Sequence, residues 1–280
     1  MNAVLGPRVV ESERSTPLAS QVSGLRLRLI SAMVLVPMAL VPVWLGGLIY
    51  AGVLAIVGVL ALFEWGRLTA AEAARQPGLV QIPFLVGALL LGMAGRYDVS
   101  AVALLAGVAV AVTVALASRR SPLWAVLAPI YVGVPLVCLL WLRTATGAGV
   151  IFFLLALVWA SDSAAFVTGK LFKGPKLAPR ISPNKTWAGA IGGLVGAALV
   201  GAVAAPYVDF SRTGPLVLVA LGLSIIGQLG DLAESGVKRH FGAKDSGALI
   251  PGHGGLLDRM DSLFFVAPAA VLWLVWHNGG

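Results

Sequence analysis

The chain has 280 residues, of which 59% are hydrophobic and only 11% are charged, a balance that excludes an ordinary water-soluble domain. Its formal net charge of +8 would attract any polyanion, but the basic residues stand in short segments between long apolar runs, which argues against a nucleic-acid partner. Cys138 is the only cysteine, so an intrachain disulfide and a thiolate metal cluster are both excluded.

Residues 1–27 carry scattered charge and no short apolar stretch followed by a cleavage site, so we expect a cytoplasmic N-terminal tail. Residues 28–280 are expected to form one transmembrane domain. Residues 29–63 carry no charge, which is too long a run for one span, and Gly46-Gly47 predicts a break into two helices. Further spans are predicted at about 80–95, 98–117, 124–142, 148–168, 187–206, 214–233 and 262–276. The predicted fold class is therefore all-α, a polytopic transmembrane helical bundle of about nine spans.

The distribution of basic residues offers a check on this count. With a cytoplasmic N-terminus and nine spans, all but three of the twenty Lys and Arg residues fall on the cytoplasmic side, the exceptions being Arg96, Arg143 and Arg212. One span more or fewer early in the chain would scatter them. No organelle-targeting segment is evident, so we expect a multi-pass protein of the inner (plasma) membrane.

Two cytoplasmic segments, 169–186 and 234–261, are longer and more polar than the others, and chemistry is expected there. Between them, the seventh span contains Gly189, Gly192, Gly193 and Gly196. No strand is predicted before these glycines, so they favour close helix packing over a nucleotide-binding loop.

The end of the eighth span places polar side chains on one helical face. Asp231, Glu234, Ser235 and Lys238 follow one another at i, i+3, i+4 and i+7. Carboxylates near the end of an apolar helix are costly unless they pair or bind a cation, so they form a functional hypothesis. The alternative is an internal ion pair between Glu234 and Lys238.

A second polar cluster leads into the last span. Lys244 and Asp245 precede a Gly-rich turn with His253, and Asp258 and Asp261 open the helix that follows. Acids at i and i+3 of a helix start suit the helix dipole and can share Mg²⁺, which takes a few carboxylates together with phosphate oxygens and water. Taken alone, Asp258 would be an ordinary N-terminal helix acid and His253 a turn residue.

A family resemblance rests on these residues. Residues 235–261 read S-x-V-K-R-x4-K-D-x-G-x2-I-P-x-H-G-G-L-x-D-R-M-D, which resembles the signature of the phosphatidate cytidylyltransferase family at every fixed position. Residues 160–166 look like the family's Asp-containing span, and residues 181–187 look like its Ser-Pro-x-Lys-Thr loop. The first half matches only in being hydrophobic. Ala188 stands where the family commonly has Glu, and Phe166 replaces a frequent tyrosine, so no acid or hydroxyl role is carried over there.

The resemblance implies an enzyme that transfers a cytidylyl group from CTP to phosphatidic acid, giving CDP-diacylglycerol and pyrophosphate, and that acts as a homodimer with Mg²⁺ and an optional second metal ion. By similarity, the metal ligands are Asp231, Glu234, Asp258 and Asp261, with Asp162 as a further candidate. The residues assigned to catalysis are Asp231, Ser235, Lys238, Arg239, Lys244, Asp245, His253, Asp258, Arg259 and Asp261. The residues assigned to substrate binding are Ser182, Lys185, Thr186, Lys238, Arg239, Lys244, Gly254, Gly255 and Arg259.

Several of these roles have alternatives. Lys185 is explained almost as well by the positive-inside rule. Asp162 is either a third metal carboxylate or a hydrogen-bonding helix acid beside Ser161 and Ser163. His253 either shuttles a proton or lies in a turn whose glycines let backbone N–H groups approach phosphate oxygens.

Rival functions predict other patterns. A transporter or lipid flippase would spread its acids across the depth of the bilayer and show two related halves. A CDP-alcohol phosphatidyltransferase would show a different Asp-rich helix, and a scaffold would leave the polar residues between 231 and 261 unexplained. The acids crowd at one interface and only in the second half, which favours the cytidylyltransferase.

Overall fold

The computed structural model describes residues 33–69, 77–119, 121–208, 216–247, 249 and 254–278. The expected tail 1–27 and His253 lie outside these residues. After a helix at Met33–Leu45, the elements are α2 (Gly47–Thr69), η1 (Pro77–Gln81), α3 (Ile82–Met93), α4 (Tyr97–Ala117), α5 (Pro122–Ala128), η2 (Pro129–Gly133), α6 (Val134–Thr146), α7 (Ala148–Phe172), β1 (Lys176–Ala178), β2 (Ser182–Thr186), α8 (Trp187–Ala204), α9 (Leu216–His240) and α10 (Leu257–Asn278).

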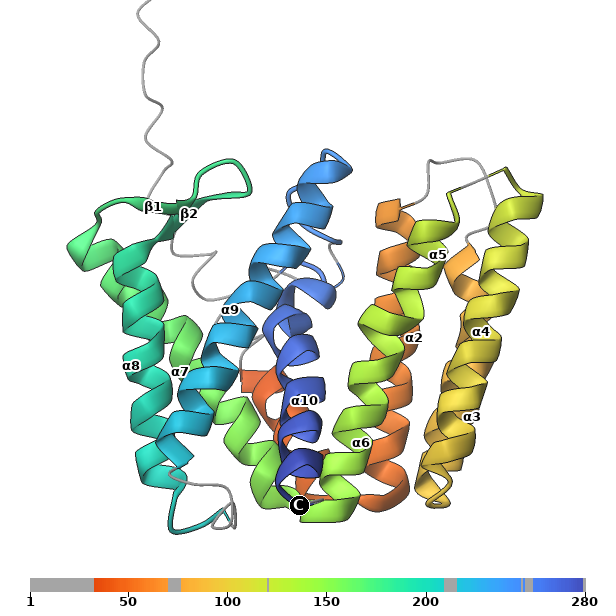
Figure 1. Ribbon diagram of the computed structural model, residues 1–280, viewed down its shortest axis with the longest axis horizontal. Coiled ribbons are helices and arrows are strands. Elements are labelled where there is room, and N and C mark those ends of the chain that lie inside the picture. Colours follow the sequence, from red (N-terminus) through yellow and green to blue (C-terminus); the bar gives the residue numbers. More distant parts are fainter. Residues whose placement is uncertain are drawn as a thin grey trace, which may run out of the picture.

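The described helices stand side by side as a bundle, with α2 to α6 forming one part and α7 to α10 the other (Figure 1). Within the described residues, seven helices are long and apolar enough to cross a membrane, and Met33–Leu45 and Leu79–Met93 are shorter apolar helices. Each predicted span therefore contains a described helix, while the count of nine membrane crossings stays a prediction. The helical bundle is confirmed.

The predicted break at Gly46-Gly47 is confirmed. Both glycines have positive φ, +66° and +53°, a region that side chains with a Cβ rarely adopt. Arg143 closes the break, because its Nε donates to the carbonyl oxygen of Val43 at 2.7 Å and its Nη2 donates to that of Trp44 at 3.2 Å. These carbonyls end the helix Met33–Leu45 and would otherwise lack a partner.

The span Pro122–Thr146 contains a π-helical turn, η2, between α5 and α6. Pro129 and Pro135 lie in and just after this turn and have no N–H group to donate, so the regular ladder of backbone hydrogen bonds cannot run through it. The turn carries Tyr131, which becomes important below.

Helices α7 and α8 pack closely along their glycines. A Cβ atom added to Gly196 would lie 2.8 Å from the carbonyl oxygen of Ala160, and one added to Gly189 would lie 2.9 Å from that of Ala165. Since such distances are too short for real Cβ atoms, the two backbones approach more closely than any larger residue would allow. The packing role predicted for the glycines of this span is confirmed.

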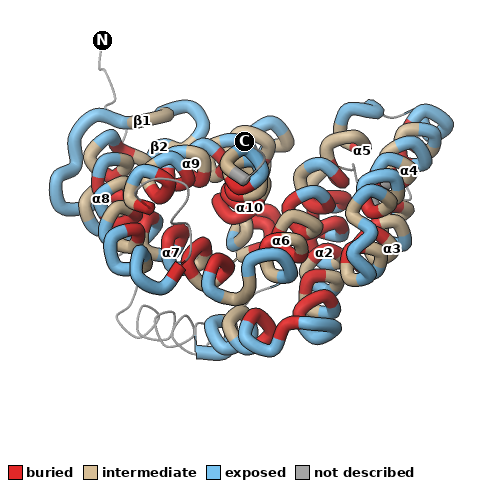
Figure 2. Tube along the Cα trace, turned by 60° about the horizontal axis from the view of Figure 1, so that its bottom comes forward, coloured by how far each residue is buried: buried red, intermediate tan, exposed pale blue. Residues whose placement is uncertain are grey.

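Buried residues lie mainly where helices face one another, and exposed residues lie on the outer sides of the bundle (Figure 2). Many of the exposed side chains are large and apolar, such as Leu272 at 71% and Trp276 at 81% exposure. An apolar exterior of this extent would be unfavourable in water and suits a lipid bilayer. The chain is thus a multi-pass membrane protein.

One element departs from the all-α expectation. Strands β1 and β2 form an antiparallel hairpin inside the polar segment 169–186, pairing Lys176 with Thr186 and Ala178 with Ser182. The hairpin lies over the ends of α7 and α8 (Figure 1). Strand β2 contains Pro183 and Asn184, residue types that are depleted in strands, so the hairpin could not be predicted from local propensity.

Replacing Arg143 by Met should destabilise the protein by about 1–3 kcal/mol, because two backbone carbonyls lose a charged donor. The thermal unfolding midpoint in detergent measures this loss. Arg96→Met is the matched control, since the pair between Arg96 and Asp98 is 62% and 71% exposed and should contribute little. Equal midpoints for the two variants would contradict the role given to Arg143.

Candidate active site

The polar residues singled out in the sequence gather at one end of the bundle. This is the end where α7 and α9 finish, where α10 begins, and over which the β1–β2 hairpin lies (Figure 1). The described parts of the two polar segments, 169–186 and 234–261, therefore lie at the same end of the bundle.

Lys238 is paired with two carboxylates from two helices. Its Nζ lies 3.2 Å from Oε1 of Glu234 on α9 and 2.6 Å from Oδ1 of Asp258 on α10. Glu234 and Lys238 are both buried, which is tolerable because each charge has an opposite partner. The internal ion pair that the i, i+4 spacing allowed is formed, and Asp258 extends it to the last helix.

Tyr131, from the π-helical turn, completes the surroundings of Glu234. Its hydroxyl donates to Oε2 of Glu234 at 2.7 Å. The ring packs against Trp65 and Phe264, with ring centroids 5.1 and 5.6 Å away. The sequence reading missed Tyr131, because a single tyrosine in an apolar span gives no local sign of a partner 103 residues away.

The hairpin is joined to α9 by a second ion pair. Nζ of Lys185 on β2 lies 2.5 Å from Oδ2 of Asp231, whose Oδ1 also accepts a long hydrogen bond of 3.5 Å from Ser235. Arg239 adds a link, since its Nε donates to the carbonyl oxygen of Ile181 at 3.3 Å. Lys185 is thus held by a carboxylate of the predicted cluster, an arrangement that the positive-inside rule does not require.

Asp258 organises the loop that precedes α10. Its Oδ2 accepts from the backbone N–H and the hydroxyl of Ser246, both at 3.0 Å, and from the N–H of Gly255 at 2.9 Å. Gly254 has a φ of +83°, which lets the chain turn into this helix start. Asp258 therefore does more than an ordinary N-terminal helix acid, because it also ties the loop to Lys238.

Glu64 on α2 enters the same region from the first half of the chain. It is only 2% exposed, and its Oε1 and Oε2 accept from the N–H groups of Leu256 and Leu257 at 2.9 and 2.8 Å. The hydroxyl of Ser246 lies 3.2 Å from its Oε2. The sequence reading missed Glu64, although an isolated acid in an apolar span was a signal that could have found it.

Two further carboxylates, Asp162 and Asp261, interact electrostatically with Asp231, so that the three acids come from three helices. The charge of Asp261 on α10 interacts with those of Asp231 on α9 and Asp162 on α7, and Arg259 and Lys185 act on Asp162 with the opposite sign. Oxygen donors of this kind suit a hard divalent cation. Among the described residues, no three His, Cys, Asp or Glu side chains are arranged so as to hold a metal ion. The three carboxylates thus suit a hard divalent cation by the type of their donor atoms and do not form a metal site by themselves in the described part of the chain.

The other predicted residues occupy varied positions. Lys244, Asp245 and Arg259 are exposed, and Ser182 is half-buried. Thr186 is buried and caps α8, because its Oγ1 accepts from the N–H of Gly189 at 3.1 Å. The hydroxyl oxygen of Thr186, which was assigned to substrate binding, therefore accepts a hydrogen bond within the protein.

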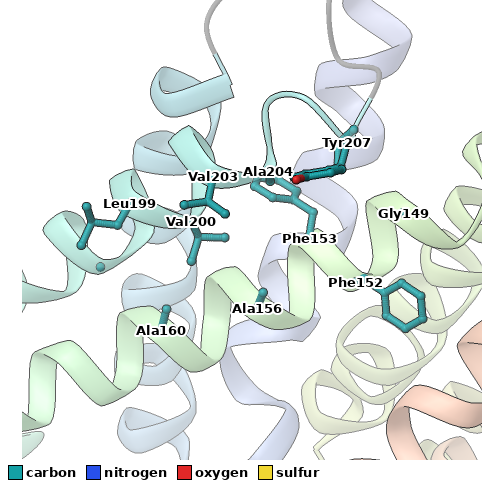
Figure 3. A pocket seen from close by; sticks show the side chains of 12 residues that line it. Gly149, Phe152, Phe153, Ala156, Ala160, Leu199, Val200, Val203, Ala204 and Tyr207 are labelled. Carbon is teal, nitrogen blue, oxygen red and sulfur yellow. The ribbon is translucent and has the colours of Figure 1, made fainter.

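An apolar cavity lies away from these charges. About 560 Å³ in volume, it lies between α7 and α8 toward the opposite end of the bundle and is lined by residues such as Ala156, Val203 and Tyr207 (Figure 3). A much smaller cavity of about 10 Å³ adjoins Asp162 and is lined in part by Ser224 and Gln228. The charged cluster itself lies at the polar end of the bundle, where Glu234 and Lys238 are buried while Lys244 and Arg259 are exposed.

Carboxylates from three helices, set among lysines and arginines at the polar end of a membrane bundle, define a membrane-embedded enzyme that handles phosphate groups. Comparison with known proteins narrows the class: the chain belongs to the Cytidylyltransferase family, whose profile matches residues 26–277. It is therefore a nucleotidyltransferase, and the family resemblance read from the sequence is confirmed.

Two relatives illustrate the similarity. The chain is 41% identical over 255 residues to the phosphatidate cytidylyltransferase of Brucella suis biovar 1 (strain 1330), covering 90% of this chain and 93% of the relative. It is 34% identical over 259 residues to the phosphatidate cytidylyltransferase of Staphylococcus aureus (strain COL), covering 90% of this chain and 99% of the relative. The likeness thus extends over nearly the whole length of both proteins.

Replacing Tyr131 by Phe should destabilise the protein by about 1–3 kcal/mol, because the buried Glu234 loses a hydrogen bond while the ring packing is kept. Thermal unfolding in detergent tests this. Tyr207→Phe removes the same hydroxyl from a residue that is 82% exposed and should leave the midpoint unchanged. A Tyr131→Phe midpoint as high as that control would refute the stabilising role of the hydrogen bond.

Proposed function

We propose that this chain transfers the cytidylyl group of CTP to phosphatidic acid, giving CDP-diacylglycerol and pyrophosphate. Membership of the Cytidylyltransferase family and the names of the full-length relatives support the reaction. The structural observation that carries the proposal is the meeting of two lysine–carboxylate pairs, Lys185 with Asp231 and Lys238 with Asp258, from two separate polar segments.

In the proposed reaction, a phosphate oxygen of phosphatidic acid forms a bond to the α-phosphorus of CTP. The bond from the α-phosphorus to the oxygen that bridges to the β-phosphate breaks, and pyrophosphate leaves with the electron pair. A phosphomonoester is already largely ionised at neutral pH, so a general base is not needed and His253 need not act as one. Such a reaction mainly requires positioning of the two substrates and neutralisation of charge.

We assign a divalent cation, Mg²⁺ by family resemblance, to the carboxylates of Asp231 and Asp261, with Asp162 nearby. When bound, it would neutralise phosphate charge and polarise the phosphorus that is attacked. Glu234 and Asp258, the other predicted ligands, both pair with Lys238 in this structure, and Asp231 likewise pairs with Lys185, so each of these carboxylates also orients an ammonium group.

The basic side chains are assigned to the phosphates. Lys185 and Lys238 present ammonium groups that are already oriented by carboxylates, which favours binding of a phosphate without a large loss of side-chain entropy. Arg239 and Arg259 offer guanidinium groups that can grip a phosphate through two parallel hydrogen bonds. The polar segment 234–261 also contains the other predicted site residues Ser235, Asp245, Gly254 and Gly255.

The position of the polar residues suits two substrates of opposite solubility. The lysine–carboxylate pairs gather at one end of the bundle, and many of the exposed side chains along the helices are large and apolar. Phosphatidic acid could thus keep its acyl chains in the bilayer while its phosphate meets CTP at the surface. We place this end on the cytoplasmic side of the inner membrane, with the N-terminus on the same side, because most Lys and Arg residues would then face the cytoplasm.

The purified protein in detergent should convert labelled CTP and phosphatidic acid into lipid-soluble label in the presence of Mg²⁺, and chelation should abolish the conversion. Asp231→Asn and Asp261→Asn should each lower kcat about 100-fold or more, because the charge of the reacting phosphates loses its counter-ion. Asp98→Asn, the same change at an exposed acid on α4, is the control and should leave kcat unchanged.

Folded wild-type protein that forms no lipid-soluble label would refute the proposed reaction and favour the transporter alternative. Full activity in both Asp variants would refute the assignment of the cation to these carboxylates while leaving the reaction intact.

Lys244→Met should raise the KM for CTP about tenfold and change kcat little, if this exposed lysine contacts the triphosphate. Steady-state kinetics with varied CTP measure the effect. Lys173→Met removes the same charge from an exposed residue just after α7 and is the matched control. An equal KM in both variants would exclude Lys244 from CTP binding.

A further inference from the structure

We infer that Glu64 is a positioning residue for the reaction, holding the start of α10 and the loop before it so that Asp258 meets Lys238. The inference rests on the proposed function, since it concerns the same group of residues. Glu64 lies on α2, in the half of the chain that carries none of the sequence motif.

The first N–H groups of a helix have no partner within the helix. At the start of α10, Glu64 accepts the N–H groups of Leu256 and Leu257, while Asp258 accepts that of Gly255. Two carboxylates thus accept from three successive N–H groups, of which Gly255 and Leu256 lie just before α10 and Leu257 is its first residue. Glu64, one of the two carboxylates, lies on another helix. Negative charge at this position also suits the dipole of α10.

Ser246 connects the two carboxylates. Its hydroxyl lies 3.2 Å from Oε2 of Glu64 and 3.0 Å from Oδ2 of Asp258, and a hydroxyl has only one proton to donate. A continuous chain of contacts therefore runs from Glu64 through Ser246 to Asp258 and on to Nζ of Lys238. Movement of the Glu64 carboxylate would be transmitted to the ammonium group along this chain.

The backbone is wrapped closely around Glu64. A Cβ atom added to Gly247 would lie 2.7 Å from Oε1 of Glu64, and one added to Gly255 would lie 2.8 Å from its Oε2. The glycines of the loop thus leave space for this carboxylate. Gly247 and Gly255 are therefore needed to make room for the carboxylate of Glu64. This reason is separate from the earlier expectation that glycines let the backbone approach a phosphate.

Kinetics on the detergent-solubilised full chain test the inference. Glu64→Gln keeps the size of the side chain but replaces one acceptor oxygen by an NH2 group. The backbone N–H of Leu256 or Leu257 then loses its acceptor and faces a donor instead. We expect kcat to fall about 10- to 100-fold, which is typical when a residue that orients a functional side chain is replaced. The KM for either substrate should change little. Glu64→Asp, which keeps the charge with a shorter reach, should recover part of kcat. Asp98→Asn again serves as the exposed-acid control.

A double-mutant cycle with Ser246→Ala separates positioning from general stability. If Glu64 acts through Ser246 and Asp258, the fold-decrease in kcat of the double variant should be smaller than the product of the fold-decreases of the two single variants. Multiplicative losses, or an unchanged kcat in folded Glu64→Gln, would overturn the inference. An inactive wild type would instead refute the proposed function.

Should Glu64→Gln fail to fold, Gly247→Ala perturbs the same contact from the loop side and keeps the carboxylate. The inference then requires a fall in kcat at an unchanged thermal midpoint. Wild-type kcat in folded Gly247→Ala would overturn it.

Discussion

The charge of Lys238 has to be balanced inside an apolar bundle, and much of the polar end is arranged around this requirement. A buried ammonium group is costly without partners, so it draws carboxylates from α9 and α10. Each carboxylate then needs donors of its own: Tyr131 serves Glu234, while Ser246 and Gly255 serve Asp258. One buried cation thereby links the π-helical turn, the loop after α9 and the start of the last helix.

The same requirement explains why the polar residues occur at one end. Along the rest of the bundle, many of the exposed side chains are large and apolar, and Arg143 supplies the donors for the carbonyls at the Gly46-Gly47 break. Glycine contacts hold α7 and α8 together without polar side chains. Charges are concentrated where several helix ends and the hairpin can supply partners, and a reaction between a lipid phosphate and a nucleotide needs charges at this depth.

The parts of the structure set by local spacing were predictable from the sequence. The face formed by Asp231, Glu234 and Lys238 follows from the helical repeat, and the break at Gly46-Gly47 follows from run length and glycine. Glu64 and Tyr131 were missed because their partners lie 192 and 103 residues away, and no periodicity reports such contacts. The hairpin was missed because its short second strand carries residues that disfavour strands.

The contact between α2 and the start of α10 bears on how the chain can be divided. A fragment that begins at α7 would contain the entire sequence motif and both lysine–carboxylate pairs. It would lack the carboxylate that closes the last helix and the tyrosine that supports Glu234. The half that holds the recognisable chemistry therefore depends on the other half for contacts within its own polar cluster.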